Sequence, residues 1–170
     1  MAIRKALVII GTGQVGELPA ADQLYSNQNT SLLANAITTI VANTNTLLSF
    51  SAAINEVWLI EINMTVQCSG VGGSKFQITA PTGATVEGWV DSTGAAITTM
   101  VRQRITAINT LNATAMHTVA NIPAPDFIWA RVKMSTTAGN ISLGFASVTA
   151  GQTTTIFAGA NMKVFKTNEA

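Results

Sequence analysis

Residues 57–68 read Val-Trp-Leu-Ile-Glu-Ile-Asn-Met-Thr-Val-Gln-Cys, and apolar side chains occupy every second position from Trp58 to Cys68. The positions between them include Glu61, Asn63, Thr65 and Gln67. Because successive side chains of a strand point to opposite faces, this alternation predicts a long strand with one buried face.

Similar alternating stretches recur along the chain and are separated by turn-forming residues. We expect strands within 75–80, 86–91, 97–108, 127–134, 141–145 and 153–166. Short strands at this spacing, with no strong apolar stripe of helical period, favour an all-β antiparallel β-sandwich or jelly roll over a parallel sheet interleaved with helices. The glycine-rich turn at 69–74 further predicts that 57–68 and 75–80 pair as a hairpin.

The chain divides into three predicted parts. Residues 1–25 are expected to form an extended N-terminal attachment arm, 26–45 a linker with the first β segment, and 46–170 the jelly-roll β-sandwich. With 170 residues, 48% of them hydrophobic, the chain can bury one sizeable core, and this composition excludes a disordered protein.

The charge composition restricts the partners of this protein. Nine Lys and Arg against eight Asp and Glu leave a net charge of +1, so the sequence lacks the basic field that nucleic-acid binding requires. No apolar run approaches the ~18 residues of a membrane helix. Only 10% of residues are charged, compared with about 25% in ordinary domains, so the surfaces are either polar and uncharged or covered by other subunits. Of the two, we favour a homo-oligomer over a free monomer.

One literal motif is not expected to function. Residues 11–16, Gly-Thr-Gly-Gln-Val-Gly, match the G-x-G-x-x-G of dinucleotide-binding folds. That motif requires a helix to begin within the glycines, but Pro19 and a polar stretch follow, and no Asp or Glu occurs about twenty residues later. We predict a turn after an edge strand and no cofactor.

The sequence offers few candidates for catalysis or metal binding. His117 and Cys68 are the only residues of their kinds, and the carboxylates are scattered singly. An enzymatic site would have to form around His117, Cys68 or Glu87. We instead expect a hydrogen-bonded or solvent-facing histidine and a buried cysteine, with no catalytic residues, no metal site and no enzymatic activity.

Two segments are candidate interaction surfaces. The arm carries a basic pair and an apolar run that usually need a partner strand or groove in order to be tolerated, and its candidate attachment residues are Arg4, Lys5, Leu7, Val8, Ile9 and Ile10. A second group is expected on the outward face of residues 127–134, namely Phe127, Trp129, Arg131 and Lys133. That group is either a contact strip or an ordinary sheet surface guarded by charge.

The chain resembles a group of bacteriophage virion proteins that contain a small jelly-roll domain, found in head-decoration, head-fibre and tail-associated proteins. The stretches that carry this resemblance are 47–50, 57–61, 75–85, 128–132, 137–143 and 155–164, together with 4–8, 13–15 and 17–20 near the N-terminus. They cover most of the chain.

The resemblance implies a non-enzymatic, trimeric virion component made in the cytoplasm of a bacterial host. Its sandwich would face outward, and its arm would attach to the major capsid protein or to another virion component. Because the chain has no heptads and no long repeat, a capsid cement or decoration protein is favoured over a fibre shaft. The alternative is a tail-fibre or host-adhesion module that binds a host glycan.

Overall fold

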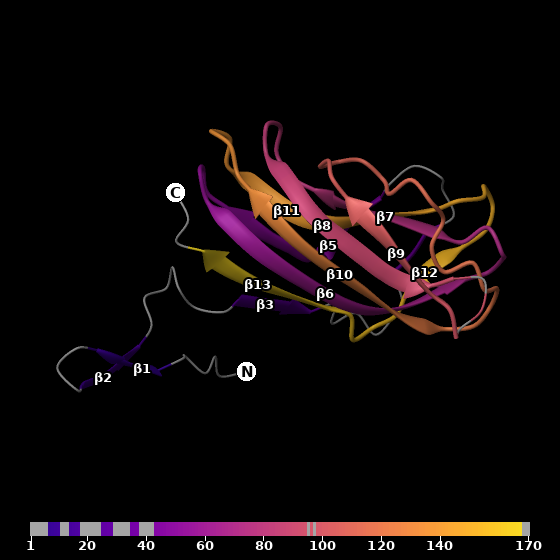
Figure 1. The fold of residues 1–170 in the computed structure, drawn as a ribbon, viewed down its shortest axis with the longest axis horizontal. Coiled ribbons are helices and arrows are strands. Elements are labelled where there is room, and N and C mark those ends of the chain that lie inside the picture. Colours follow the sequence, from indigo (N-terminus) through magenta and orange to yellow (C-terminus); the bar gives the residue numbers. More distant parts are fainter. Residues whose placement is uncertain are drawn as a thin grey trace.

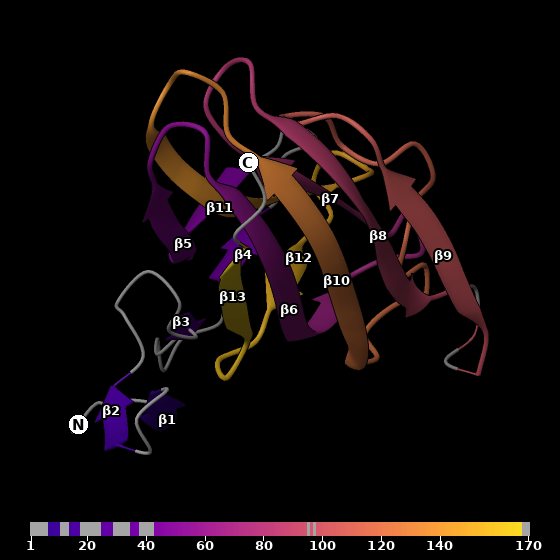
Figure 2. The same ribbon diagram turned by 60° about the vertical axis from the view of Figure 1, so that its left-hand side comes forward.

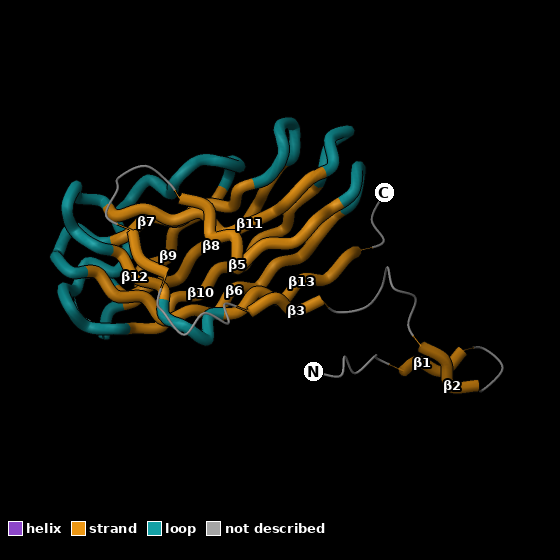
Figure 3. The backbone as a smooth tube through the Cα atoms, turned by 180° about the vertical axis from the view of Figure 1, so that it is seen from behind, coloured by secondary structure: helices purple, strands orange, loops and turns teal. Residues whose placement is uncertain are grey.

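A computed structural model describes residues 7–10, 14–17, 25–28, 35–37, 43–94, 96 and 98–167. Every regular element within these ranges is a β-strand (Figure 3). No helix in the described part of the chain is long and apolar enough to cross a membrane. The predicted all-β class is therefore confirmed.

The strands form two main antiparallel sheets, which Figure 2 shows one behind the other. The larger sheet has the order β3 (Tyr25–Gln28), β13 (Asn161–Thr167), β6 (Val57–Cys68), β10 (Ala124–Lys133), β8 (Thr85–Thr93) and β9 (Met100–Ile105). In the same sheet, β12 (Thr154–Ile156) lies between β6 and β4 (Asn35–Ile37). The smaller sheet has the order β5 (Asn43–Ala52), β11 (Gly139–Ser147) and β7 (Ser74–Thr79).

The connections between consecutive strands give a jelly roll. The chain crosses from one sheet to the other between β5 and β6, between β6 and β7, and between β7 and β8. After β9 it returns to the smaller sheet, where Met116 forms an antiparallel bridge to Ser74 of β7, and it then crosses again to β10 and back to β11. Thus β6-β10-β8-β9 faces β5-β11-β7 plus the Met116 bridge, which is the strand arrangement of a jelly roll.

The predicted hairpin between residues 57–68 and 75–80 is wrong. In the structure β6 pairs with β10, β13 and β12, whereas β7 pairs with β11 in the opposite sheet. The turn at 69–74 therefore leads from one layer to the other. Strand periodicity and turn residues are the same for a hairpin and for such a crossing, so the local sequence does not distinguish them.

The core lies between the inner faces of the two sheets. On β6, Ile60, Ile62 and Val66 are at most 1% exposed, as the alternation predicted. The smaller sheet contributes Phe76 and Phe145, both fully buried. Each Å² of apolar surface that is removed from water stabilises the fold by about 25 cal/mol, so this shared core holds the two sheets together.

The first two strands form a separate two-stranded sheet (Figure 1). β1 (Leu7–Ile10) pairs antiparallel with β2 (Gln14–Glu17), so Ile10 lies opposite Gln14. In a dinucleotide site, a helix begins within the glycine motif. Here residues 14–17 form the strand β2 instead, so that helix does not begin there. β3 and β4 pair with β13 and β12 of the larger sheet.

Candidate functional site

The predicted outward strip lies on β10. Phe127 and Lys133 are exposed and Trp129 and Arg131 are half-buried, while the alternate positions from Ile128 to Val132 are buried. The orientation of all four side chains is as predicted, and they lie on the side of the larger sheet opposite the core. We call this side the outer face. The role of the strip as a contact surface stays a prediction.

The outer face brings together a tryptophan pair that the sequence analysis did not identify. Antiparallel register places Trp89 of β8 directly opposite Trp129 of β10. Their rings stack with centroids 4.6 Å apart and an interplanar angle of 20°. Alternation along 85–91 would have put Trp89 on a solvent-facing side, but nothing local in the sequence reveals that β8 and β10 are neighbours.

The guanidinium of Arg102 on β9 packs against the Trp89 ring, and Asp91 balances its charge. Its Nε and Nη2 donate to Oδ1 and Oδ2 of Asp91, both at 2.6 Å, and its guanidinium lies 5.3 Å from the Trp89 ring centroid. The hydrogen bonds from Arg102 lower the pKa of Asp91, outweighing its partial desolvation. Since β9 and β10 flank β8, Trp89 has Arg102 on one side and Trp129 on the other.

Large apolar side chains remain exposed on this face. Trp89 is 37% exposed, Phe127 is 43% exposed and Phe165 of β13 is 38% exposed. We define the aromatic patch as Trp89, Phe127 and Trp129. Tryptophan and arginine are the residue types most often enriched at the energetic centres of protein interfaces, so the patch has the composition of a contact surface.

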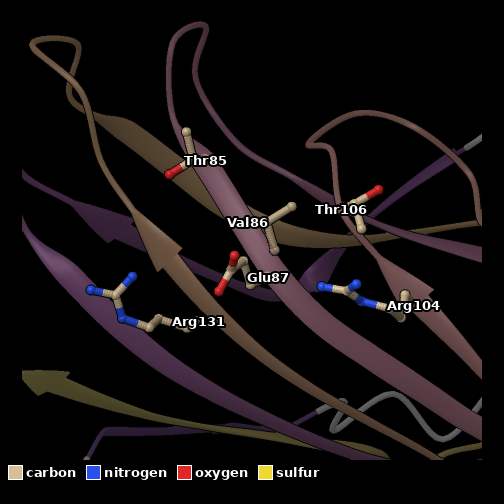
Figure 4. Close-up of a pocket in the computed structure, with 6 residues that line it drawn as sticks. All are labelled: Thr85, Val86, Glu87, Arg104, Thr106 and Arg131. Atoms are coloured by element: carbon tan, nitrogen blue, oxygen red, sulfur yellow. The ribbon is translucent and has the colours of Figure 1, made fainter.

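A polar hollow adjoins the aromatic patch on the outer face (Figure 4). It has a volume of about 400 Å³ and is lined by Thr85, Val86, Glu87, Arg104, Thr106 and Arg131. Register places Glu87 directly opposite Arg131, while Arg104 lies opposite Trp89, two residues further along β8. The hollow therefore gathers side chains from three adjacent strands.

The predicted attachment residues are only partly within the described chain. Arg4 and Lys5 lie outside the described residues. Leu7, Val8, Ile9 and Ile10 form β1 and pair with β2 of the same chain. Whether this strand also contacts a capsid stays a prediction.

His117 lies inside the protein and both of its ring nitrogens have partners. The residue is fully buried; Nε2 donates to the Ile122 carbonyl oxygen at 2.9 Å, and Nδ1 lies 3.0 Å from Thr93 Oγ1. Because the Ile122 carbonyl only accepts, Nε2 carries a proton, and in the neutral ring Nδ1 accepts from Thr93. A histidine held in this way does not reach a substrate from this position.

Asp126 is the residue that the sequence analysis missed beside His117. Its Oδ1 accepts from Ser92 Oγ at 2.6 Å and lies 3.7 Å from His117 Nδ1, while its buried Oδ2 has no hydrogen-bond partner. Burial raises the pKa of this carboxyl group, although His117 and Ser92 act in the opposite direction. The signal was present, since Asp126 is in phase with the inward Ile128 and Ala130.

Cys68 is buried, as predicted. Its Sγ lies 3.7 Å from Thr154 Oγ1, and burial raises the pKa of the thiol. Neither Cys68 nor His117 therefore presents a reactive group on the surface. Among the residues that the structure describes, no cluster of three His, Cys, Asp or Glu side chains could hold a metal ion.

Comparisons with known proteins give only distant structural likenesses. No protein-family model matches the chain, and no curated protein matches it. It is similar to the structure of the Gt strain of infectious bursal disease virus (10% identity, 95% of this chain and 47% of that chain, TM-score 0.26) and to that of the Gx strain (12%, 95% and 46%, 0.23). The crystal structure of the infectious bursal disease virus VP2 subviral particle is also similar (11%, 95% and 45%, 0.21).

The chain thus spans just under half the length of the viral chains that it matches. Identities of 10–12% and TM-scores below 0.3 establish no shared function.

Proposed function

We propose that this protein is a non-enzymatic structural component of a virion, a capsid cement or decoration protein that acts as a homotrimer. The observation that carries the proposal is the aromatic patch on the outer face. Trp89 and Phe127 each keep more than a third of their surface exposed within one small area of an otherwise well-packed sandwich. A surface of this composition is stabilised when a partner covers it.

The partner that we propose for the patch is a neighbouring copy of the chain. With 10% charged residues and a net charge of +1, identical subunits repel each other weakly and can approach closely. The jelly-roll fold and the sequence resemblance to phage decoration proteins support the same assembly. A closed trimer would shield the patch without leaving an unpaired copy of it.

The N-terminal segment is proposed to attach the trimer to the capsid. If a capsid groove buries Leu7, Val8, Ile9 and Ile10, each side chain contributes up to about 2 kcal/mol. Three arms on one trimer bind with a raised effective concentration, so moderate affinity per arm gives stable occupancy. Subunits that bind only the assembled shell stabilise it by mass action.

Self-association is tested by sedimentation equilibrium of the wild-type chain and of Phe127→Glu. We expect the wild type to sediment at three times the 17.7 kDa chain mass and Phe127→Glu at the monomer mass, because the new carboxylate would be buried without a partner. Val71→Glu is the matched control, since Val71 is 72% exposed in a turn away from the patch. A monomeric wild type, or a Phe127→Glu variant that remains trimeric with the same circular dichroism, contradicts the proposal.

Attachment is tested on virions that lack this protein. Adding the full chain should restore occupancy, whereas a chain without residues 1–12 should remain folded and trimeric but fail to bind. If the shortened chain binds at wild-type occupancy, the segment is not the anchor.

A second candidate function is recognition of the host surface, as in a tail-fibre or adhesion module. The polar hollow favours this function, because it gathers hydrogen-bonding groups at a concave site of about 400 Å³. Binding of the isolated protein to host cells, without binding to capsids, would support this function over decoration.

A further inference from the structure

Two arginines on the edge strand β9 differ in what they bind. The fork of Arg102 is filled by both carboxylate oxygens of Asp91. Arg104, two residues further on the same face, has no carboxylate within ion-pair distance in the described part of the chain. Figure 4 shows its side chain extending from β9 into the hollow, toward Glu87.

Glu87 supplies the opposite kind of group. It projects from β8 between Arg104 and Arg131, and Figure 4 shows the Arg131 side chain running away from it. No described cation lies within ion-pair distance of Glu87 either. One hollow therefore holds an arginine fork that only donates and a carboxylate that only accepts, and Thr85 and Thr106 also line it.

We propose that this hollow binds a monoanionic saccharide, a sugar that carries one carboxylate, such as a hexuronic acid. Its carboxylate would accept two parallel hydrogen bonds from Arg104, and its hydroxyl groups would donate to Glu87. The proposal deepens the second candidate function, host-surface recognition, and does not require the trimer.

The same groups discriminate against other ligands. A dianionic phosphate would also fill the arginine fork, but it would bring a second negative charge close to Glu87 and has few hydroxyl groups to donate to it. A neutral hexose would satisfy Glu87 but leave Arg104 without its anionic partner. A polar hollow is likewise a poor site for an apolar ligand, because its donors and acceptors would lose water without replacement.

The test is a titration of the full-length protein by amide chemical shifts, with the methyl glycoside of glucuronic acid as the probe. Methyl glucoside is the neutral isostere and inorganic phosphate is the competing anion. We expect saturable shifts at residues 85–87, 104–106 and 131 with the glucuronide, and binding at least about tenfold weaker for the other two ligands.

Two variants test whether Arg104 and Glu87 bind the ligand, and a third variant is the control. Arg104→Gln should weaken glucuronide binding about tenfold, to the level of the neutral sugar. Glu87→Gln should weaken the binding of both sugars and strengthen that of phosphate, which a merely structural role would not do. Lys163→Gln removes an exposed cation from β13 on the same face and should leave every affinity unchanged.

The proposal is overturned by any of four results: no saturable shift up to ~10 mM glucuronide, equal binding of glucoside and glucuronide, tighter binding of phosphate, or an Arg104→Gln variant that binds like the wild type. Each variant must show the wild-type melting temperature. If the protein does not bind the glucuronide but still binds host cells, only the ligand class is rejected. If it binds neither, host recognition is rejected as well.

Discussion

Replacing Asp126 with asparagine tests how the buried carboxyl group changes the stability of the sandwich with pH. Asp126 is fully buried, one of its oxygens has no hydrogen-bond partner, and the nearest imidazole nitrogen is 3.7 Å away. Its pKa is raised above the ordinary value of 3.8, chiefly by burial. Asparagine keeps an oxygen that can accept from Ser92 but cannot ionise.

The sign follows from proton linkage. A group whose pKa is higher in the folded than in the unfolded state binds protons more tightly in the folded state, so its contribution to stability is complete below the unfolded pKa and is lost as pH rises through the folded pKa. Each unit of difference contributes about 1.4 kcal/mol. From acidic to neutral pH, we therefore expect wild type to lose stability relative to Asp126→Asn.

The measurement is urea unfolding followed by tryptophan fluorescence at constant ionic strength, over a pH series that starts below pH 4 and ends near pH 7. Asp91→Asn is the control with the opposite sign. Arg102 lowers the pKa of Asp91, so that contribution is present above the unfolded pKa and is lost as pH falls through the folded pKa. A pH-independent difference between wild type and Asp126→Asn would refute the reasoning. A wild type that gains stability relative to Asp126→Asn as pH rises would also contradict a raised pKa of Asp126.

Three further predictions concern packing and access. Phe145→Ala removes a fully buried ring from the shared core and should lower the free energy of unfolding by about 3–5 kcal/mol in urea, and a loss below ~1 kcal/mol would contradict the packing. Gly73→Ala should cost more stability than Gly151→Ala, because both glycines have positive φ but only at Gly73 would a Cβ collide, with the Met116 carbonyl oxygen; equal losses would be inconsistent with this contact. The Cys68 thiol should react with a disulfide reagent only as fast as the protein unfolds, since burial raises its pKa and blocks access, and rapid reaction of the native protein would show otherwise.

Alternation was enough to predict which side chains face inward. The periodicity of β6 and β10 separates Ile60, Ile62 and Ile128 from the outward Phe127, and the structure buries these residues as expected. The same alternation along β10 puts Asp126 in the buried phase. Such predictions succeed because the two faces of a strand depend only on its local backbone geometry.

The functional groupings could not be predicted in the same way. The Trp89–Trp129 stack and the hollow between Arg104 and Glu87 exist because β8 lies between β9 and β10 in a particular register. The wrong hairpin prediction has the same origin, since β6 and β7 are consecutive in sequence but lie in opposite sheets.

By itself, the sequence determined the β class, the strands and their buried faces, because these depend on interactions between near neighbours in the chain. Only the tertiary structure decided which strands pair, and therefore which side chains meet on the outer face and which carboxyl group lies beside His117. Many pairs of strands could form equivalent backbone hydrogen bonds, so the local sequence does not specify which strands pair. The pairing that forms is the one that buries the apolar faces of both sheets in one common core.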